Sequence, residues 1–159
     1  MLLSALLCLS GQAVAQGISA DNWQESDTAP PASFSTKHLQ FFEVSPGSTL
    51  VYGMDPDTLT VGADGVVRYV LVASSARGAL NVLYEGIRCQ TAEMKTYARW
   101  DNHSAWNTGT GSDWRPLSFS GSTRHAMRLA RDGVCDGSTP NGSALNILQA
   151  LQRGPNIPR

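Results

Sequence analysis

The chain of 159 residues is poor in lysine, in net charge and in long apolar runs. Only Lys37 and Lys95 are lysines, and 12 basic residues stand against 13 acidic ones, which gives a formal net charge of −1. The basic stripe that releases counterions from nucleic acid is missing, so no nucleic-acid partner is expected. The length allows one domain with a core and is too short for two independent enzymatic domains.

Motifs for common catalytic and metal sites are also missing. The three histidines, His38, His103 and His125, have no H-x-H or i, i+4 spacing and form no H-E-x-x-H motif, so no metal and no cofactor is expected. There is no G-x-S-x-G nucleophile motif, and no glycine-rich phosphate loop follows an expected strand. His103 or His125 could still serve a small hydrolase-like or metal-assisted enzyme, which we keep as the alternative function.

The first fifteen residues join an apolar stretch to small residues that end at Ala15 in the A-x-A pattern of signal peptidase sites. We therefore expect a signal peptide over residues 1–15, cleavage after Ala15, and a mature periplasmic protein with no transmembrane span. Cys8 follows Leu7 rather than a small residue, which argues against a lipoprotein.

Cysteine is scarce, and removal of Cys8 with the signal peptide leaves only Cys89 and Cys135. Two cysteines in an oxidising compartment favour a disulfide, here between a strand end and the segment after a short helix. Closing this loop would remove unfolded-state entropy worth about 4 kcal/mol. A catalytic thiolate would need a nearby histidine, and tetrahedral zinc would need more cysteines at short spacing; neither pattern is present.

The segment after the signal peptide has little regular pattern. Residues 16–36 are polar, contain Pro30-Pro31 and show no sustained period of 2 or 3.6, which predicts a flexible N-terminal arm. Trp23 is the exception, because a lone tryptophan in such a segment usually docks on the domain. We expect one domain over residues 37–154 and a short tail over 155–159.

Within the domain, short apolar runs alternate with turn residues, as in an antiparallel meander. The Asp64-Gly65 pair predicts a tight hairpin. Helical spacing of apolar residues, with a serine before and a glycine after each run, predicts helices over 122–133 and 143–154. The fold class is therefore α+β, with about five or six strands and two C-terminal helices. The expected strands lie at 39–44, 49–54, 58–61, 66–72, 79–89 and 93–100.

The strand that ends at Cys89 poses a problem of phase. A β-bulge at Gly86, which we favour, would turn Ile87 and Cys89 to the same face as Val82 and leave Glu85 outside. Regular alternation would instead place Glu85 among apolar side chains, where a carboxylate needs a partner. Arg115 is the candidate partner for such a buried ion pair.

The segment after Trp100 is rich in glycine, asparagine and serine, and it predicts a long loop that Trp106 and Trp114 anchor. Tryptophans can also stack on a sugar ring or a peptide. Trp106, Trp114 and Arg115 are therefore the candidate contacts to a ligand or partner, although anchoring of the loop explains the tryptophans more simply.

Several segments together resemble a known family. The hairpin "GADGVVRY", the strand end "YEGIRC", the motifs "EMKTYARW" and "DWRPL", and the terminal "ALNILQALQRG" are similar to the cryptic neisserial protein-like family of small exported proteobacterial proteins. The resemblance covers roughly Trp23 to Gly154. It implies export and a compact α+β domain, and no established activity or catalytic residue to carry over. The segment "RDGVC" departs from the pattern, since aromatic residues are expected before the second cysteine.

The sequence thus predicts an exported, non-enzymatic binding or interaction module of the periplasm or envelope. The expected partner is an envelope protein, a peptide or a glycan.

Overall fold

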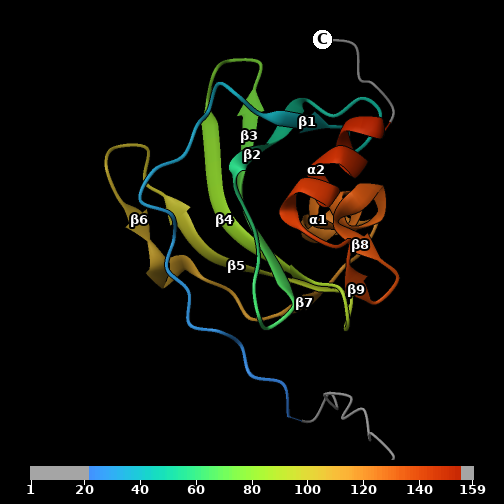
Figure 1. Cartoon of the computed structure of the whole chain (residues 1–159). Helices are drawn as coiled ribbons and strands as arrows, with labels where there is room; N and C mark the ends of the chain where they lie inside the picture. The colour runs from blue at the N-terminus through green and yellow to red at the C-terminus, as the bar shows by residue number, and fades with distance from the viewer. Residues whose placement is uncertain (1–21, 155–159) are drawn as a thin grey trace, which may run out of the picture.

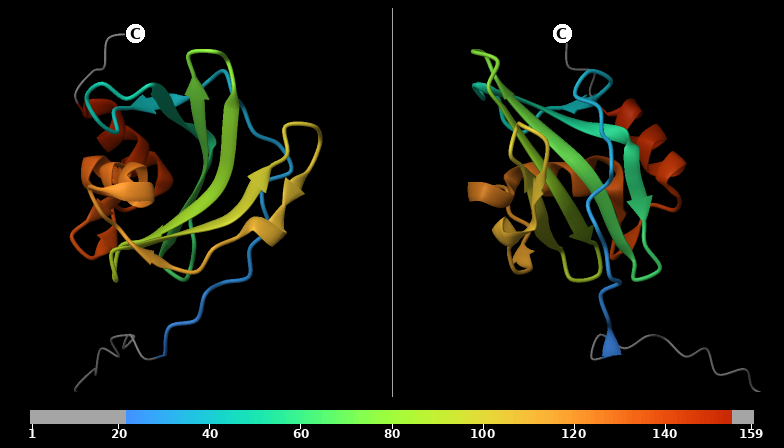
Figure 2. Two further views of the ribbon diagram at one scale, coloured as in Figure 1. Left: turned by 180° about the vertical axis from the view of Figure 1, so that it is seen from behind. Right: turned by 90° about the vertical axis from the view of Figure 1, so that its left-hand side faces the viewer.

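The computed structural model describes residues 22–154, so the predicted signal peptide and C-terminal tail lie outside the described residues. The chain forms one curved antiparallel sheet that wraps around two helices (Figures 1 and 2). The strand order is β1-β2-β3-β4-β5-β6, the same as the order in sequence, and β7 also pairs with β5. The predicted α+β fold with an antiparallel meander and two C-terminal helices is confirmed.

Four long strands form the centre of the sheet, and shorter strands lie at its two edges. The main sheet consists of β1 (Gln40–Phe42), β2 (Leu50–Val61), β3 (Val66–Ser75), β4 (Leu80–Arg88), β5 (Glu93–Trp100), β6 (Trp106–Asn107) and β7 (Arg115–Pro116). A small ribbon of β8 (Cys135–Asp136) and β9 (Thr139–Pro140) lies beside the helices. The hairpin predicted at Asp64-Gly65 joins β2 to β3, and Gly65 has the positive φ of +74° that such a turn requires.

The helices α1 (Arg124–Leu129) and α2 (Ala144–Arg153) pack on the inner, concave face of the sheet (Figure 2). A 3-10 turn at Gly121–Thr123 leads into α1, and a π turn at Ala130–Val134 follows it; a further 3-10 turn spans Thr108–Thr110. The Ser143 hydroxyl accepts a hydrogen bond from the Asn146 amide and caps α2, as the sequence predicts. Ile147 and Leu151 of α2 are buried against the sheet.

Both faces of the sheet are buried, and β4 shows this in its alternation. Leu83 and Ile87 belong to the inner core beneath the helices, whereas Val82 and Tyr84 belong to a second apolar cluster on the outer face. Such two-sided burial explains why apolar residues occur in both phases of this strand.

The bulge predicted at Gly86 is therefore wrong. β3 pairs with β4 in continuous register from Val66↔Arg88 to Ser74↔Leu80, so Glu85 keeps its place on the inner face. The irregularity lies instead in β5, where Tyr97 is the extra residue opposite Tyr84 and Glu85. Gly86 has a different role, because a Cβ atom there would lie 2.8 Å from the Tyr97 ring.

The predicted disulfide between Cys89 and Cys135 is confirmed and joins the end of β4 to the segment after the π turn. It fastens the helical layer to the sheet across 46 residues of sequence.

None of the helices within residues 22–154 has the length and apolar character needed to cross a lipid bilayer.

Candidate binding site

Residues 22–38, which we call the strap, run across the outer, convex face of the sheet (Figure 2). This contrasts with the flexible arm expected for residues 16–36, of which 16–21 lie outside the described residues. The strap has almost no secondary structure of its own. Its order comes from individual bonds to the sheet and to the loop after β5.

The first part of the strap is held at the β2–β3 hairpin. The Trp23 indole donates to the Asp64 carbonyl at 2.8 Å, and the Ser26 amide donates to the Asp64 carboxylate at 2.9 Å. The Arg88 guanidinium lies 3.7 Å from the centre of the Trp23 ring. The predicted docking of Trp23 is thus confirmed.

Charged groups reinforce this end of the strap. Arg68 binds the Asp64 carboxylate at 2.6 Å, and Lys95 binds the Glu25 carboxylate at 2.9 Å. Burial alone would raise the pKa of Asp64, but the Arg68 guanidinium and the Ser26 and Val66 amides lower it to about 2. The pKa of Glu25 is also lowered, because bonds from Lys95 and Trp114 outweigh its partial burial.

Aromatic residues hold the second part of the strap. Phe34 packs between Trp100 and Trp106, at ring-centre distances of 5.1 and 5.2 Å. The Trp106 indole donates to the Pro31 carbonyl at 3.0 Å, and the Thr28 hydroxyl lies 3.0 Å from the hydroxyl of Tyr84. The strap therefore covers the outer apolar cluster in the way that the helices cover the inner one.

A wide bulge in β2 faces the strap. Residues 56–59 stand between Asp55 and Thr60, where β3 has only Tyr69 between the residues that pair with them. Pro56 lacks the amide needed for regular pairing, and the Thr58 hydroxyl instead accepts from the Val70 amide at 2.9 Å. The two strands predicted at 49–54 and 58–61 form one strand, β2, and the Asp55-Pro56-Asp57 segment lies in its bulge.

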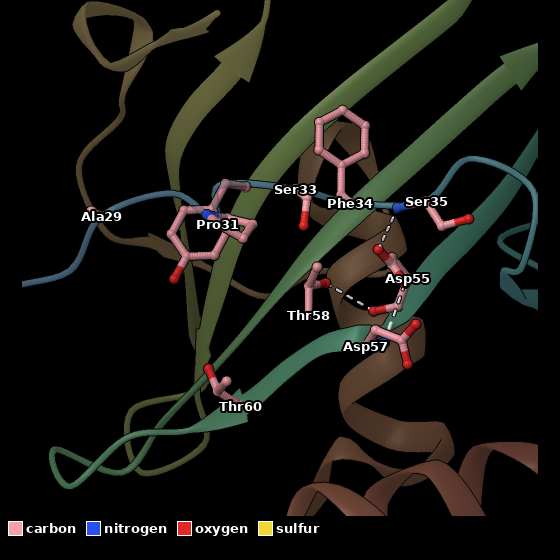
Figure 3. A pocket seen from close by; sticks show the side chains of 10 residues that line it. Ala29, Pro31, Ser33, Phe34, Ser35, Asp55, Asp57, Thr58 and Thr60 are labelled. Carbon is pink, nitrogen blue, oxygen red and sulfur yellow. Dashed lines mark hydrogen bonds between the residues drawn. The ribbon is translucent and has the colours of Figure 1, made fainter.

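Asp55 connects the bulge to the strap. Its side chain is 1% exposed, and its carboxylate accepts from the Ser35 amide at 2.7 Å and from the Asp57 amide at 3.1 Å (Figure 3). The buried carboxylate thus satisfies amides of both segments, which fixes the distance between them.

The strap and the bulge enclose an open cleft of about 420 Å³ (Figure 3). Tyr84 of β4 forms part of its wall, and the Phe34 ring points away from Asp55 and Thr58. The polar groups that line the cleft are those of Ser33, Ser35, Asp55, Asp57, Thr58 and Thr60. Ala29 and Pro31 supply apolar surface. Such a mixture of a few fixed polar groups and apolar surface is typical of a site for a small ligand.

A second cavity, of about 520 Å³, differs in character. It lies in the loop between β1 and β2, from Phe41 to Tyr52, and is lined mainly by apolar side chains. Leu50 and Val51 at its rim are 38% and 55% exposed. All of its described lining residues lie between Phe41 and Tyr52, in the ends of β1 and β2 and the loop that joins them. The strap cleft is built by three separate segments, and we therefore regard it as the candidate site.

The three predicted contact residues make bonds within the protein. The Trp114 indole donates to the Glu25 carboxylate at 3.2 Å, as Trp106 donates to Pro31. Arg115 donates to the Ser122 hydroxyl at 2.8 Å and to the Met94 sulfur at 3.4 Å. Trp106 and Trp114 thus stabilise the strap, whereas Arg115 joins β7 to β5 and to the turn before α1. Contact of any of the three with a ligand or partner stays a prediction.

Glu85 pairs with His125 rather than with Arg115. The carboxylate is 1% exposed and lies 2.8 Å from Nε2 of His125 on α1, while the Thr96 and Tyr69 hydroxyls donate to it at 3.5 and 3.4 Å. Burial would lower the pKa of His125, but the Glu85 carboxylate outweighs it and raises that pKa. The sequence indicates each residue as a candidate but not their pairing, because 40 residues separate them.

His103 lies in an exposed turn, where the amides of residues 103–105 donate to the Asp101 carboxylate. This bonding lowers the pKa of Asp101, and it is the pattern of a turn closed by an aspartate side chain. Within residues 22–154 no three histidine, cysteine or acidic side chains gather in a group able to hold a metal ion.

The cleft itself was missed from the sequence. Asp55-Pro56-Asp57 has the composition of a turn, and the polar strap shows no sustained period of 2 or 3.6. The available signal was local: a proline between two aspartates inside an otherwise continuous strand pattern indicates a bulge as well as a turn.

Comparison with known proteins gives a family and no activity. The family model described as the CNP1-like family matches residues 19–152. Among curated proteins and among solved structures, none matches significantly. The longer name given to the resemblance above stays an expectation. Because the match spans most of the sequence, including the strap, the sheet and both helices, the chain belongs to the CNP1-like family.

Proposed function

We propose that this protein is a non-enzymatic binding module that holds a small ligand, or the end of a peptide or glycan, in the strap cleft. The observation that carries the proposal is the construction of the cleft from three separate segments. The buried Asp55 carboxylate bonds both to the strap and to the bulge, so the walls are fixed before any ligand arrives. Pre-formed walls reduce the entropy lost on binding.

We also propose that the protein works outside the cytoplasm, in the periplasm or at the envelope. The disulfide supports this, because such bonds persist in oxidising compartments. Mass spectrometry of the protein recovered from the periplasmic fraction should give a chain that starts at Gln16. Recovery of the uncleaved chain from the cytoplasm would contradict the proposal.

The experiment for the binding function is a fragment screen followed by amide NMR shifts. We expect the shifted amides to cluster in residues 29–35 and 55–60. A tryptophan placed in each cavity provides a matched pair of variants: Ser33→Trp should abolish these shifts, and Ser45→Trp, which fills the loop between β1 and β2, should leave them intact. Shifts that cluster at residues 41–52 and vanish only in Ser45→Trp would place the function in the other cavity.

One observation favours a second candidate, the hydrolase-like enzyme. Nε2 of His125 lies 2.8 Å from Glu85, which is within reach for an acid–base pair. Against this, Tyr52 stacks on the imidazole with a 5° angle between the rings, and His125 lines none of the cavities described above. Turnover of chromogenic esters that disappears in His125→Gln, while the folding of that variant is unchanged, would favour the enzyme.

A further inference from the structure

The ionisable side chains that line the strap cleft are all of one sign. Asp55 and Asp57 are carboxylates, and none of the residues between 22 and 154 that line the cleft is a lysine, an arginine or a histidine. The remaining polar groups of the lining are hydroxyls, which accept as well as donate hydrogen bonds. A ligand that supplies hydrogen-bond donors and positive charge is therefore complementary to the cleft.

The two carboxylates differ in how much of their bonding capacity is in use. Asp55 is buried and accepts two backbone amides. The exposed Asp57 carboxylate has no hydrogen bond and no ion pair with any residue between 22 and 154. Figure 3 shows its carboxylate directed away from the Asp55 carboxylate. It is thus the group with free acceptor capacity for an incoming donor.

Arg68 of β3, the cation opposite a residue of the cleft, already has a carboxylate partner. Arg68 pairs in register with Thr60, which lines the cleft, but both terminal nitrogens of its guanidinium bind the Asp64 carboxylate, at 2.6 and 3.1 Å. Arg68 Nη2 also lies 3.9 Å from Glu25. Among residues 22–154, no lysine, arginine or histidine forms an ion pair with Asp55 or Asp57.

A metal ion fits this arrangement poorly, since the part of the chain that the structure describes offers no third acidic, histidine or cysteine ligand. The apolar surface of Ala29, Pro31 and the Tyr84 ring suits a carbon chain beside the charge. A protonated amine on a short carbon chain meets both requirements.

From these observations we infer that the strap cleft binds an organic cation, a protonated alkylamine whose ammonium group meets Asp57. This inference rests on the proposed binding function and adds the chemical class of the ligand.

The test uses three probes of one length and three charges: cadaverine, 1,5-pentanediol and glutarate, each followed by amide NMR shifts of the purified protein. We expect cadaverine to shift residues 29–35 and 55–60 in a saturable manner, and glutarate to leave them unchanged. Asp57→Asn should weaken cadaverine binding about three- to fivefold, as expected for one exposed ion pair. Asp136→Asn, which removes an exposed aspartate of β8 far from the cleft in sequence, should not.

The outcomes separate the two proposals. If pentanediol shifts the same residues as strongly as cadaverine, or if Asp57→Asn binds cadaverine as well as the unchanged protein does, the cation inference is overturned and the binding cleft stands. If glutarate binds more tightly than cadaverine, the cleft prefers a negative ligand, which also overturns the cation inference. If no probe shifts these residues while other fragments do, the cleft binds ligands of another class, and the cation inference again fails.

Discussion

The inner face of the sheet is covered by helices, whereas the outer face is covered by a strap with almost no secondary structure. The helical layer is fastened by a disulfide and by the buried pair of Glu85 and His125. The strap is fastened by single bonds from indoles, amides and carboxylates. The difference indicates that the inner face is built for stability, and that the outer face leaves room for a cleft.

The largest expected effect concerns the disulfide of the inner face. Cys135→Ser should lower the free energy of unfolding by about 4 kcal/mol, because the loop of 46 residues is no longer closed in the unfolded chain. Urea denaturation measures the change. The reduced unchanged protein is the matched control and should show the same loss. Equal midpoints for the oxidised protein and the variant would contradict the prediction.

The next effect concerns the buried pair. His125→Ala should cost about 3 kcal/mol, because it leaves the Glu85 carboxylate buried without a cation. His103→Ala, in an exposed turn, should change the free energy of unfolding by less than about 0.5 kcal/mol. Thermal or urea unfolding of the two variants gives the comparison, and similar values for both would show that the pair adds little.

The two faces should respond to pH in opposite directions. On the outer face, the pKa of Asp64 falls from 3.8 to about 2, so its contribution of about 2 kcal/mol is complete above pH 4 and is lost as the pH falls toward 2. On the inner face, the pKa of His125 lies above its unfolded value of 6.5, so its contribution is complete below that value and is lost as the pH rises through the folded pKa.

Urea unfolding across the pH range tests this contrast. Asp64→Asn should reduce the loss of stability at acid pH, of which Glu25 contributes the remainder, and should leave the loss above neutral pH. His125→Ala should remove the loss above neutral pH and leave the loss at acid pH. Asp113→Asn, an exposed aspartate of the loop, is the control for the first variant. A single variant that flattened both limbs would refute the assignment to separate faces.

The smallest effect concerns one strap bond. Trp106→Phe keeps an aromatic ring beside Phe34 and removes the indole donor to the Pro31 carbonyl, which should cost about 1 kcal/mol. The loss should be visible as faster hydrogen exchange in the strap, with little change in α1 or α2. Equal acceleration in the helices would mean that the strap and the inner layer unfold as one unit.

Features with a local pattern could be predicted from the sequence. The Asp64-Gly65 hairpin and the two C-terminal helices depend on spacing or residue type within a short window. The disulfide spans 46 residues and was predictable because only two cysteines remain after the predicted signal peptide. The strap could not be predicted, since its order arises from contacts such as Trp106 to Pro31, which are 75 residues apart. The partner of Glu85 could not be predicted for the same reason. His125 on α1 pairs with it in place of the expected Arg115, and no local pattern indicates which helix residue faces a given strand position.

The phase of β4 shows why one covered face was expected rather than two. A bulge at Gly86 would have gathered most apolar residues on one side, which is the usual solution for a sheet with a single core. Because the strap buries the outer face as well, apolar residues are stable on both sides of β4, and the strand stays regular without a bulge.

The most direct test of the account is hydrogen exchange at the amides of Ser26 and Ser35, which donate to the carboxylates of Asp64 and Asp55. Both amides should exchange much more slowly than the amide of the exposed Ala32 between them, because a docked strap forms one wall of the cleft. Exchange of Ser26 and Ser35 at the rate of an unfolded chain would mean that the strap is not docked, and that the cleft proposed as the binding site does not exist.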